Sequence, residues 1–185
     1  MHDVIALWHA DHVNFAKLLN LLEDQLERFH AGDSPEYELM LDVMHYMTHY
    51  PDVLHHPKED LVFAKIKERA RSARPTIDEL TEQHARLRES GRELVHDLDA
   101  IVNGSITSRE LIEAAARAYV MNFRNHMRVE ETEILPLAAT VLRGKDWKAV
   151  EAAIRHIQDP LFGAKTEERY VALRQHIATQ ARLRD

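Results

Sequence analysis

One pattern of residues occurs twice in this chain: a histidine, followed about forty positions later by a histidine and a glutamate that are four residues apart. The first copy is His12, His55 and Glu59, and the second is His84, His126 and Glu130. Residues four apart lie one turn apart on the same face of a helix. The pattern therefore predicts helices, and each His/Glu pair is either a surface ion pair or part of a metal site.

Apolar residues spaced by three and four flank each of these six polar residues and predict amphipathic helices. In the first predicted helix, Asp3 to Phe29, the apolar seam contains His12 and the residues Ile5, Trp8, Phe15, Leu19, Leu22 and Leu26. The other predicted helices run from Pro35 to about Ala70, from Thr76 to Asn103 and from Thr107 to about Arg143. Four long helices with short connections predict an all-α fold, an antiparallel up-down four-helix bundle.

Glycine, proline and capping residues mark the expected helix ends. Gly32 is a typical helix-terminating residue, and Pro51 and Pro57 predict a kink or break in the second helix. Thr76 and Thr107 each precede a glutamate by three positions, which is the pattern of a capping box.

Two shorter helices are expected after the bundle, from about Trp147 to Ile157 and from Glu167 to Ala181, and they should pack outside it. A chain of 185 residues fits one domain. We expect residues 1–143 to form the metal-binding bundle and residues 144–185 to form a helical extension of the same domain.

The duplication decides between the two interpretations of the His/Glu pairs. A lone histidine in an apolar seam is more often a hydrogen-bonded core residue, and solvated His/Glu pairs are common on helices. Here the first predicted helix repeats as the third with a shift of 72 residues, and the second repeats as the fourth with a shift of 71. All three polar residues of the first copy therefore recur in the second. Burying a polar group without a partner costs a few kcal/mol, so six such groups favour metal ligation over a dry core.

Composition excludes several other classes of function. The chain has no cysteine, which removes disulfides and thiolate metal sites, but it has 13 histidines. Its formal net charge of −7, without a basic run interleaved with aromatics, argues against nucleic acid or an anionic membrane as a partner. We find no signal peptide and no apolar stretch of about 20 residues, so a cytoplasmic location is expected.

Several neighbouring residues are weaker candidates for the site. His9 is the one plausible extra ligand, and Glu131 could replace Glu130 if the helix is locally distorted. Asp60 and Glu131 are otherwise expected to face solvent or to support the ligands. His56 follows His55 directly and should point about 100° away on a helix, so we expect it not to share the site.

The ligand types predict the metal. Two histidines for each ion, with two carboxylates able to bridge, favour a pair of six-coordinate ions. Imidazole with carboxylate suits iron, then manganese, with zinc as a further substitute.

The order His12, His55-x-x-x-Glu59, His84, His126-x-x-x-Glu130 resembles the hemerythrin-like (HHE cation-binding) family. The segments "HHPKEDLVF" and "DPLFG" are similar to segments of its bacterial members. The resemblance covers about Asp3 to Arg143. It implies an up-down bundle around a carboxylate-bridged non-haem di-iron centre, with the four histidines as terminal ligands and the two glutamates as bridges.

The chain departs from the oxygen-carrying members of that family in two places. Arg88 stands where the third helix of those members has a second histidine, and the fourth helix has HxxxE in place of HxxxxD. The ligand set is similar to that of di-iron proteins that repair damaged iron centres, but their Cys-containing segment is absent.

Two functions remain open at this point. The protein binds or senses oxygen, peroxide or nitric oxide, or it is an enzyme that reduces peroxide or nitric oxide or donates iron for repair. A metal-free interaction bundle is the third possibility. A homo-oligomer is possible, and a sensing role would need a partner chain to carry the signal.

Overall fold

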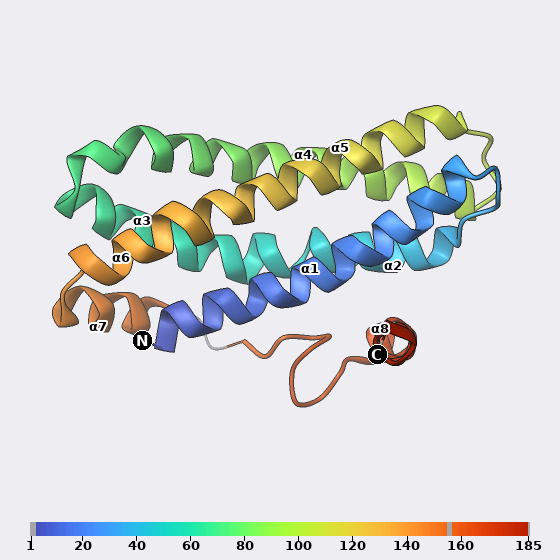
Figure 1. Ribbon diagram of the computed structural model, residues 1–185. Coiled ribbons are helices and arrows are strands. Elements are labelled where there is room, and N and C mark those ends of the chain that lie inside the picture. Colours follow the sequence, from blue (N-terminus) through green and yellow to red (C-terminus); the bar gives the residue numbers. More distant parts are fainter. Residues whose placement is uncertain (1–2, 155–156, 185) are drawn as a thin grey trace.

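The computed structural model describes residues 3–154 and 157–184, which are mostly helical, with no strand in these ranges. The bundle helices, shown in Figure 1, are α1 (Asp3–His30), α2 (Tyr37–Met47), α3 (His56–Arg69), α4 (Arg74–Val102), α5 (Arg109–Val129) and α6 (Leu135–Val141). Two π-helical segments, η1 (Pro51–His55) and η3 (Glu130–Ile134), and a 3-10 turn, η2 (Arg71–Ala73), connect them. The C-terminal elements are α7 (Gly144–Ala153), the 3-10 turn η4 (Glu168–Tyr170) and α8 (Val171–Arg184).

The helices form four long rods, and the predicted all-α four-helix bundle is confirmed. The first rod is α1, the second α2 with α3, the third α4, and the fourth α5 with α6 (Figure 1). Consecutive rods run in opposite directions. α1 packs on α2 and α5, and α4 packs on the same two helices, so the rods enclose a common core.

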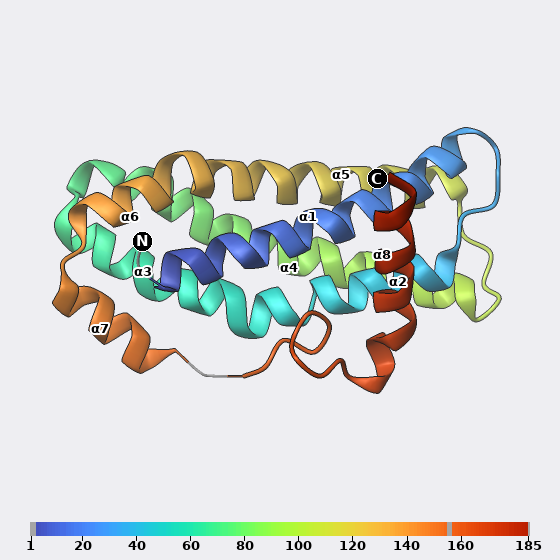
Figure 2. The same cartoon turned by 60° about the horizontal axis from the view of Figure 1, so that its bottom comes forward.

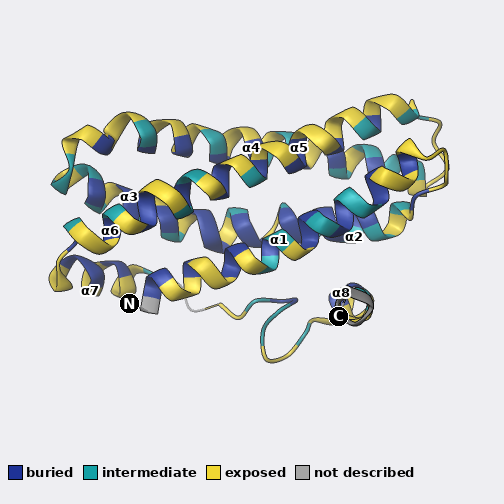
Figure 3. Ribbon diagram, viewed as in Figure 1, coloured by how far each residue is buried: buried dark blue, intermediate teal, exposed yellow. Residues whose placement is uncertain are grey.

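The buried residues face the inside of the bundle (Figure 3). The apolar ones form two clusters, and the six polar residues of the repeated pattern lie between them. On α1, Trp8 belongs to one cluster and Phe15 to the other, with His12 between them. On α4, His84 lies between Leu80 and Leu87 in the same way. The bundle therefore holds a polar layer in the middle of an otherwise apolar core.

The expected kink in the second rod is confirmed, and it is a π-helical turn. In η1 the His56 backbone N–H donates to the carbonyl of Pro51, five residues earlier, in place of the usual four. Proline lacks a backbone N–H and crowds the preceding turn, which favours such a widened turn near Pro51 and Pro57. In the fourth rod, η3 lies just before Pro136, for the same reason.

The helix ends differ in part from the expectation. Gly32 and Gly104 both have φ of +88°, a left-handed conformation that favours glycine after a helix. The two capping boxes were wrong: α4 begins at Arg74, before Thr76, and the residue preceding α5 is Ser108 rather than Thr107. The turn η2 runs directly into α4, so Thr76 already lies inside the helix.

The C-terminal helices pack outside the bundle, as expected. α7 lies against α3, and α8 crosses α1 and α2 (Figure 2). α7 begins three residues earlier than predicted, and residues 155–156 of that predicted helix lie outside the described residues. Between α7 and α8, Asp159 of "DPLFG" accepts hydrogen bonds from the backbone N–H groups of Leu161 and Phe162 and from the Tyr46 hydroxyl, each at 2.8 Å.

Candidate metal centre

The structure brings together all six residues of the repeated pattern. Each rod contributes one histidine to the polar layer, and the side chains of His12, His55, Glu59, His84, His126 and Glu130 are all buried. The i, i+4 spacing turns each His/Glu pair toward the bundle axis. The surface ion-pair interpretation is therefore wrong for both pairs.

Glu59 lies between two groups of histidines. Its Oε1 is 2.6 Å from Nε2 of His55 and 3.5 Å from Nε2 of His12. Its Oε2 is 3.2 Å from Nε2 of His84, which belongs to the other half of the site. One carboxylate oxygen thus faces each half, as a bridging ligand requires.

Glu130 also touches both halves. Its Oε2 lies 3.3 Å from Nε2 of His12 and 3.3 Å from Nε2 of His126. The two glutamates therefore stand between the same two groups of imidazoles.

The four histidines share one orientation: Nε2 points inward and Nδ1 points to an oxygen on the outside. The Nδ1 to oxygen distances are 2.8 Å for His12 to Glu131, 2.9 Å for His55 to Asp11, 3.1 Å for His126 to Gln83 and 3.4 Å for His84 to Asp60. An outer acceptor keeps the proton on Nδ1 and leaves the Nε2 lone pair available, which is the usual arrangement of metal-binding histidines. The Trp8 indole nitrogen lies 3.1 Å from Nε2 of His12.

Most of the inward-facing atoms have no hydrogen bond to other described residues. These atoms are both carboxylate oxygens of Glu59 and of Glu130, and Nε2 of His84 and His126. Buried polar atoms are normally paired, and leaving one unpaired costs about 1–3 kcal/mol. Imidazole nitrogens and carboxylate oxygens are metal-ligand atoms, so the residues fit a bound cation.

The charges of the site also favour a cation. Burial alone lowers the pKa of His12, but the surrounding carboxylates, Glu130 first, outweigh it and raise the pKa to about 11. Burial and the nearby Glu59 charge raise the pKa of Glu130 to about 7. In the protein without a metal, protonated histidine therefore supplies the positive charge that these carboxylates need.

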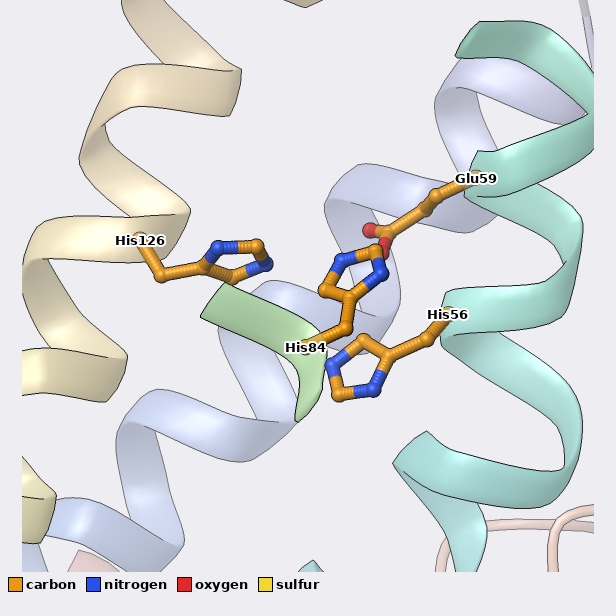
Figure 4. Close-up of side chains that lie close together, drawn as sticks. All are labelled: His56, Glu59, His84 and His126. Atoms are coloured by element: carbon orange, nitrogen blue, oxygen red, sulfur yellow. The ribbon is translucent and has the colours of Figure 1, made fainter. Parts of the chain in front are cut away.

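The expectation that His56 lies away from the site was wrong. Its side chain is 2% exposed, and its ring stacks on that of His84 with centroids 4.1 Å apart (Figure 4). Each rod in a bundle contacts two neighbouring rods. A side chain that points about 100° away from His55 therefore faces the second neighbouring rod and not solvent. His55 faces α1, and His56 faces α4 and α5.

The other candidates of the sequence lie at the periphery. The side chain of His9 is 61% exposed and pairs with Glu131 at 2.9 Å, so it is not part of the cluster. Glu131 contacts the outer nitrogen of His12 and does not take the place of Glu130. The structure thus places Glu131 beside Nδ1 of His12 and Asp60 beside Nδ1 of His84.

Asp11 was missed in the sequence, although it directly precedes His12. It is buried, and its Oδ2 contacts both Nδ1 of His55 and Nζ of Lys58, at 2.9 and 3.0 Å. Its position next to a seam residue could have identified it, because such a residue can face the second neighbouring rod. The same signal applies to His56.

A pocket with a volume of 660 Å³ reaches the centre from the side of α1, η1 and the C-terminal segment. Its wall includes His55 and Glu59, together with apolar residues of α1 and of the segment after α7, among them Leu7, Trp8, Ile154 and Phe162. A small molecule therefore has a route to the half of the site that contains His55.

Comparison with known families agrees with this geometry. Residues 3–138 match the family described as hemerythrin HHE cation binding domain. The chain therefore belongs to this family of cation-binding helical proteins. Comparisons with curated proteins and with solved structures found no significant match.

Helix length and composition bear on membrane insertion. Within the described ranges, none of the helices is both long enough and apolar enough to span a membrane.

Proposed function

We propose that the protein binds a pair of iron ions in the polar layer and uses them to bind or sense a small ligand: oxygen, peroxide or nitric oxide. The observation that supports this most strongly is the set of four inward-facing histidines around two buried carboxylates that lack hydrogen bonds to other described residues.

In this proposal His12 and His55 would hold one ion, and His84 and His126 would hold the other. Glu59 and Glu130, which each contact histidines of both halves, would serve both ions. Imidazole with carboxylate suits iron, and manganese or zinc would be the substitutes. When bound, the pair supplies redox-active positions at which a small ligand can coordinate.

The chain's own residues hold this arrangement. Asp11, Glu131 and Gln83 keep protons on the outer nitrogens of three histidines, so the inner nitrogens stay free to bind. The apolar clusters above and below the layer exclude water. The 660 Å³ pocket admits the ligand from one side.

One contact favours the alternative, an enzyme that reduces peroxide or nitric oxide. The Tyr50 hydroxyl lies in the pocket wall and donates to Oδ1 of Asp11 at 3.2 Å. Tyr50 thereby shares Asp11 with His55 and connects the pocket wall to a hydroxyl proton, which reduction needs and simple binding does not. Iron donation to damaged centres is a further form of this alternative.

Metal analysis and an optical spectrum test the proposal. The protein made with iron available is expected to contain about two iron ions per chain, and its spectrum should change on addition of air, peroxide or nitric oxide. Sustained consumption of peroxide or nitric oxide with a reductant would favour the enzyme. A metal content near zero would exclude both functions and leave the metal-free bundle.

We also propose that residues 144–185 belong to the same domain as the bundle. Trp147 and Val150 of α7 join one core cluster, and Leu161, Tyr170 and Leu173 join the other. For a sensing role, we propose that a partner chain carries the signal, which co-purification would test.

A further inference from the structure

We propose that His56 supplies a third imidazole to the ion that His84 and His126 would hold, so that the two ions have different ligand sets. This inference rests on the proposed metal binding.

His56 lies among the ligands of that half of the site. One nitrogen of His56, one each of His84 and His126, and one oxygen of Glu59 all lie within 4.8 Å of one another (Figure 4). The His56 ring centroid is 5.8 Å from that of His126 and 4.1 Å from that of His84. The residue reaches this position because η1 ends directly before it and α3 begins with it.

The alternative is a core histidine that packs on His84 and binds nothing. Such a residue normally has partners for its ring nitrogens, yet Nε2 of His56 has no hydrogen bond to the rest of the described chain, and Nδ1 has only the ion-pair contact with Asp52. Leaving a buried ring nitrogen unpaired costs about 1–3 kcal/mol. Coordination through one nitrogen removes part of this cost.

The surroundings of His56 repeat the arrangement of the other four histidines. Its Nδ1 lies 3.3 Å from Oδ1 of Asp52, and Oδ2 of Asp52 lies 3.4 Å from Nε of Arg88. An outer carboxylate that faces Nδ1 directs Nε2 to the inside, as Asp11 does for His55. Arg88, whose side chain is 41% exposed, holds that carboxylate in place and is a positioning residue.

The other half of the site has no equivalent of His56. The repeat relates His56 to Met127, a buried residue that joins the apolar core. The ion at His12 and His55 would therefore have two imidazoles where its neighbour has three. The 660 Å³ pocket reaches this same half, because its described wall includes His55 and Glu59 but neither His84 nor His126.

The unaltered protein gives the first test, loaded with cobalt(II), a paramagnetic ion that fits imidazole and carboxylate ligands. Each coordinated histidine with a protonated Nδ1 gives one shifted, exchangeable N–H resonance in the proton NMR spectrum. Five such resonances are expected if His56 binds, and four if it does not. This test needs no variant, so a folding defect cannot obscure it.

The second test is His56→Phe, which keeps a ring against His84 but removes the ligand nitrogen. We expect one cobalt ion to bind more weakly by at least the roughly 10–100-fold that loss of an outer partner of a ligand typically costs, and the other to keep its affinity. Met127→Leu at the repeat-related position is the control and should change neither affinity. Competition with a chelator measures both.

The outcomes separate this inference from the proposed function. An unaltered protein that takes up no metal contradicts the proposed function itself. Two bound ions with four imidazole resonances, and full affinity in His56→Phe, would show that His56 is a core residue and overturn only the inference.

Discussion

Oδ2 of Asp11 lies 2.9 Å from Nδ1 of His55, and both side chains are buried at the contact between α1 and η1. The same oxygen accepts a hydrogen bond from Nζ of Lys58 at 3.0 Å, and Oδ1 accepts one from the Tyr50 hydroxyl. Asp11 therefore fixes the His55 ring from outside the polar layer and connects it to the wall of the pocket.

Asp11→Asn should weaken the binding of one metal ion without removing a proposed ligand. The amide keeps the size of the carboxylate but removes its charge, so His55 loses basicity and orientation, and the affinity for one ion should fall about 10–100-fold. Chelator competition measures this. Glu23→Gln is a suitable control, because Glu23 is on the same helix and pairs with Arg124 at the protein surface. Equal affinities in the two variants would contradict the role of Asp11.

Metal binding should release protons at neutral pH. Burial lowers the pKa values of His12 and His84, but nearby carboxylates raise them to about 11 and about 10, so both are protonated at pH 7 in the metal-free protein. A ligand histidine must be neutral. We expect at least two protons to be released per protein on loading at pH 7, since Glu130, with a pKa of about 7, adds a fraction to the two histidine protons, and the apparent affinity should rise with pH until about pH 11.

Calorimetric titrations in two buffers with different ionisation enthalpies count these protons. Below pH 7, Glu130 takes up a further proton, since burial and Glu59 raise its pKa to about 7, so acidification should release the metal. Glu131→Gln removes the carboxylate at Nδ1 of His12 and should reduce the number of protons released. A proton count of zero at pH 7 would contradict the pKa shifts.

Chelation should lower the thermal stability of the protein. Ions that bind only the folded state stabilise it by RT ln(1 + [L]/Kd), which is about 4 kcal/mol at a thousandfold excess over Kd. The metal-free bundle keeps the carboxylate oxygens of Glu59 and Glu130 in its core with protonated histidine as their counter-charge and without a hydrogen bond to the described residues. Calorimetry with and without chelator measures the difference, and identical melting curves would mean that these atoms have other partners.

Leu7→Trp should slow the approach of small ligands to the centre. Leu7 is 60% exposed in the pocket wall, so a larger side chain narrows the route while contacting no proposed ligand. We expect the association rate of azide with the iron-loaded protein to fall several-fold, with the metal content unchanged. Leu111→Trp, at an exposed position outside this wall, is the control; if the two variants bind azide equally fast, the ligand uses another route.

The sequence by itself determined the architecture and the six residues of the repeated pattern. The helical spacing places His12 between Trp8 and Phe15, and His84 between Leu80 and Leu87, so each histidine must face the core if its apolar neighbours do. Because the pattern occurs twice, the two helix pairs that carry it must pack against each other to bury both polar sets. The structure brings these six residues into one layer; their role as ligands remains a prediction.

Only the tertiary structure decided what surrounds that layer. Helical periodicity identifies one buried face, but a rod in a bundle contacts two neighbours, so Asp11 and His56, each next to a seam residue, are also buried. The π-helical turn of η1 shifts the phase of the helix by an amount that the position of Pro51 alone does not specify. The pocket arises from contacts between α1 and the segment after α7, which are far apart in sequence, and no local pattern encodes such a contact.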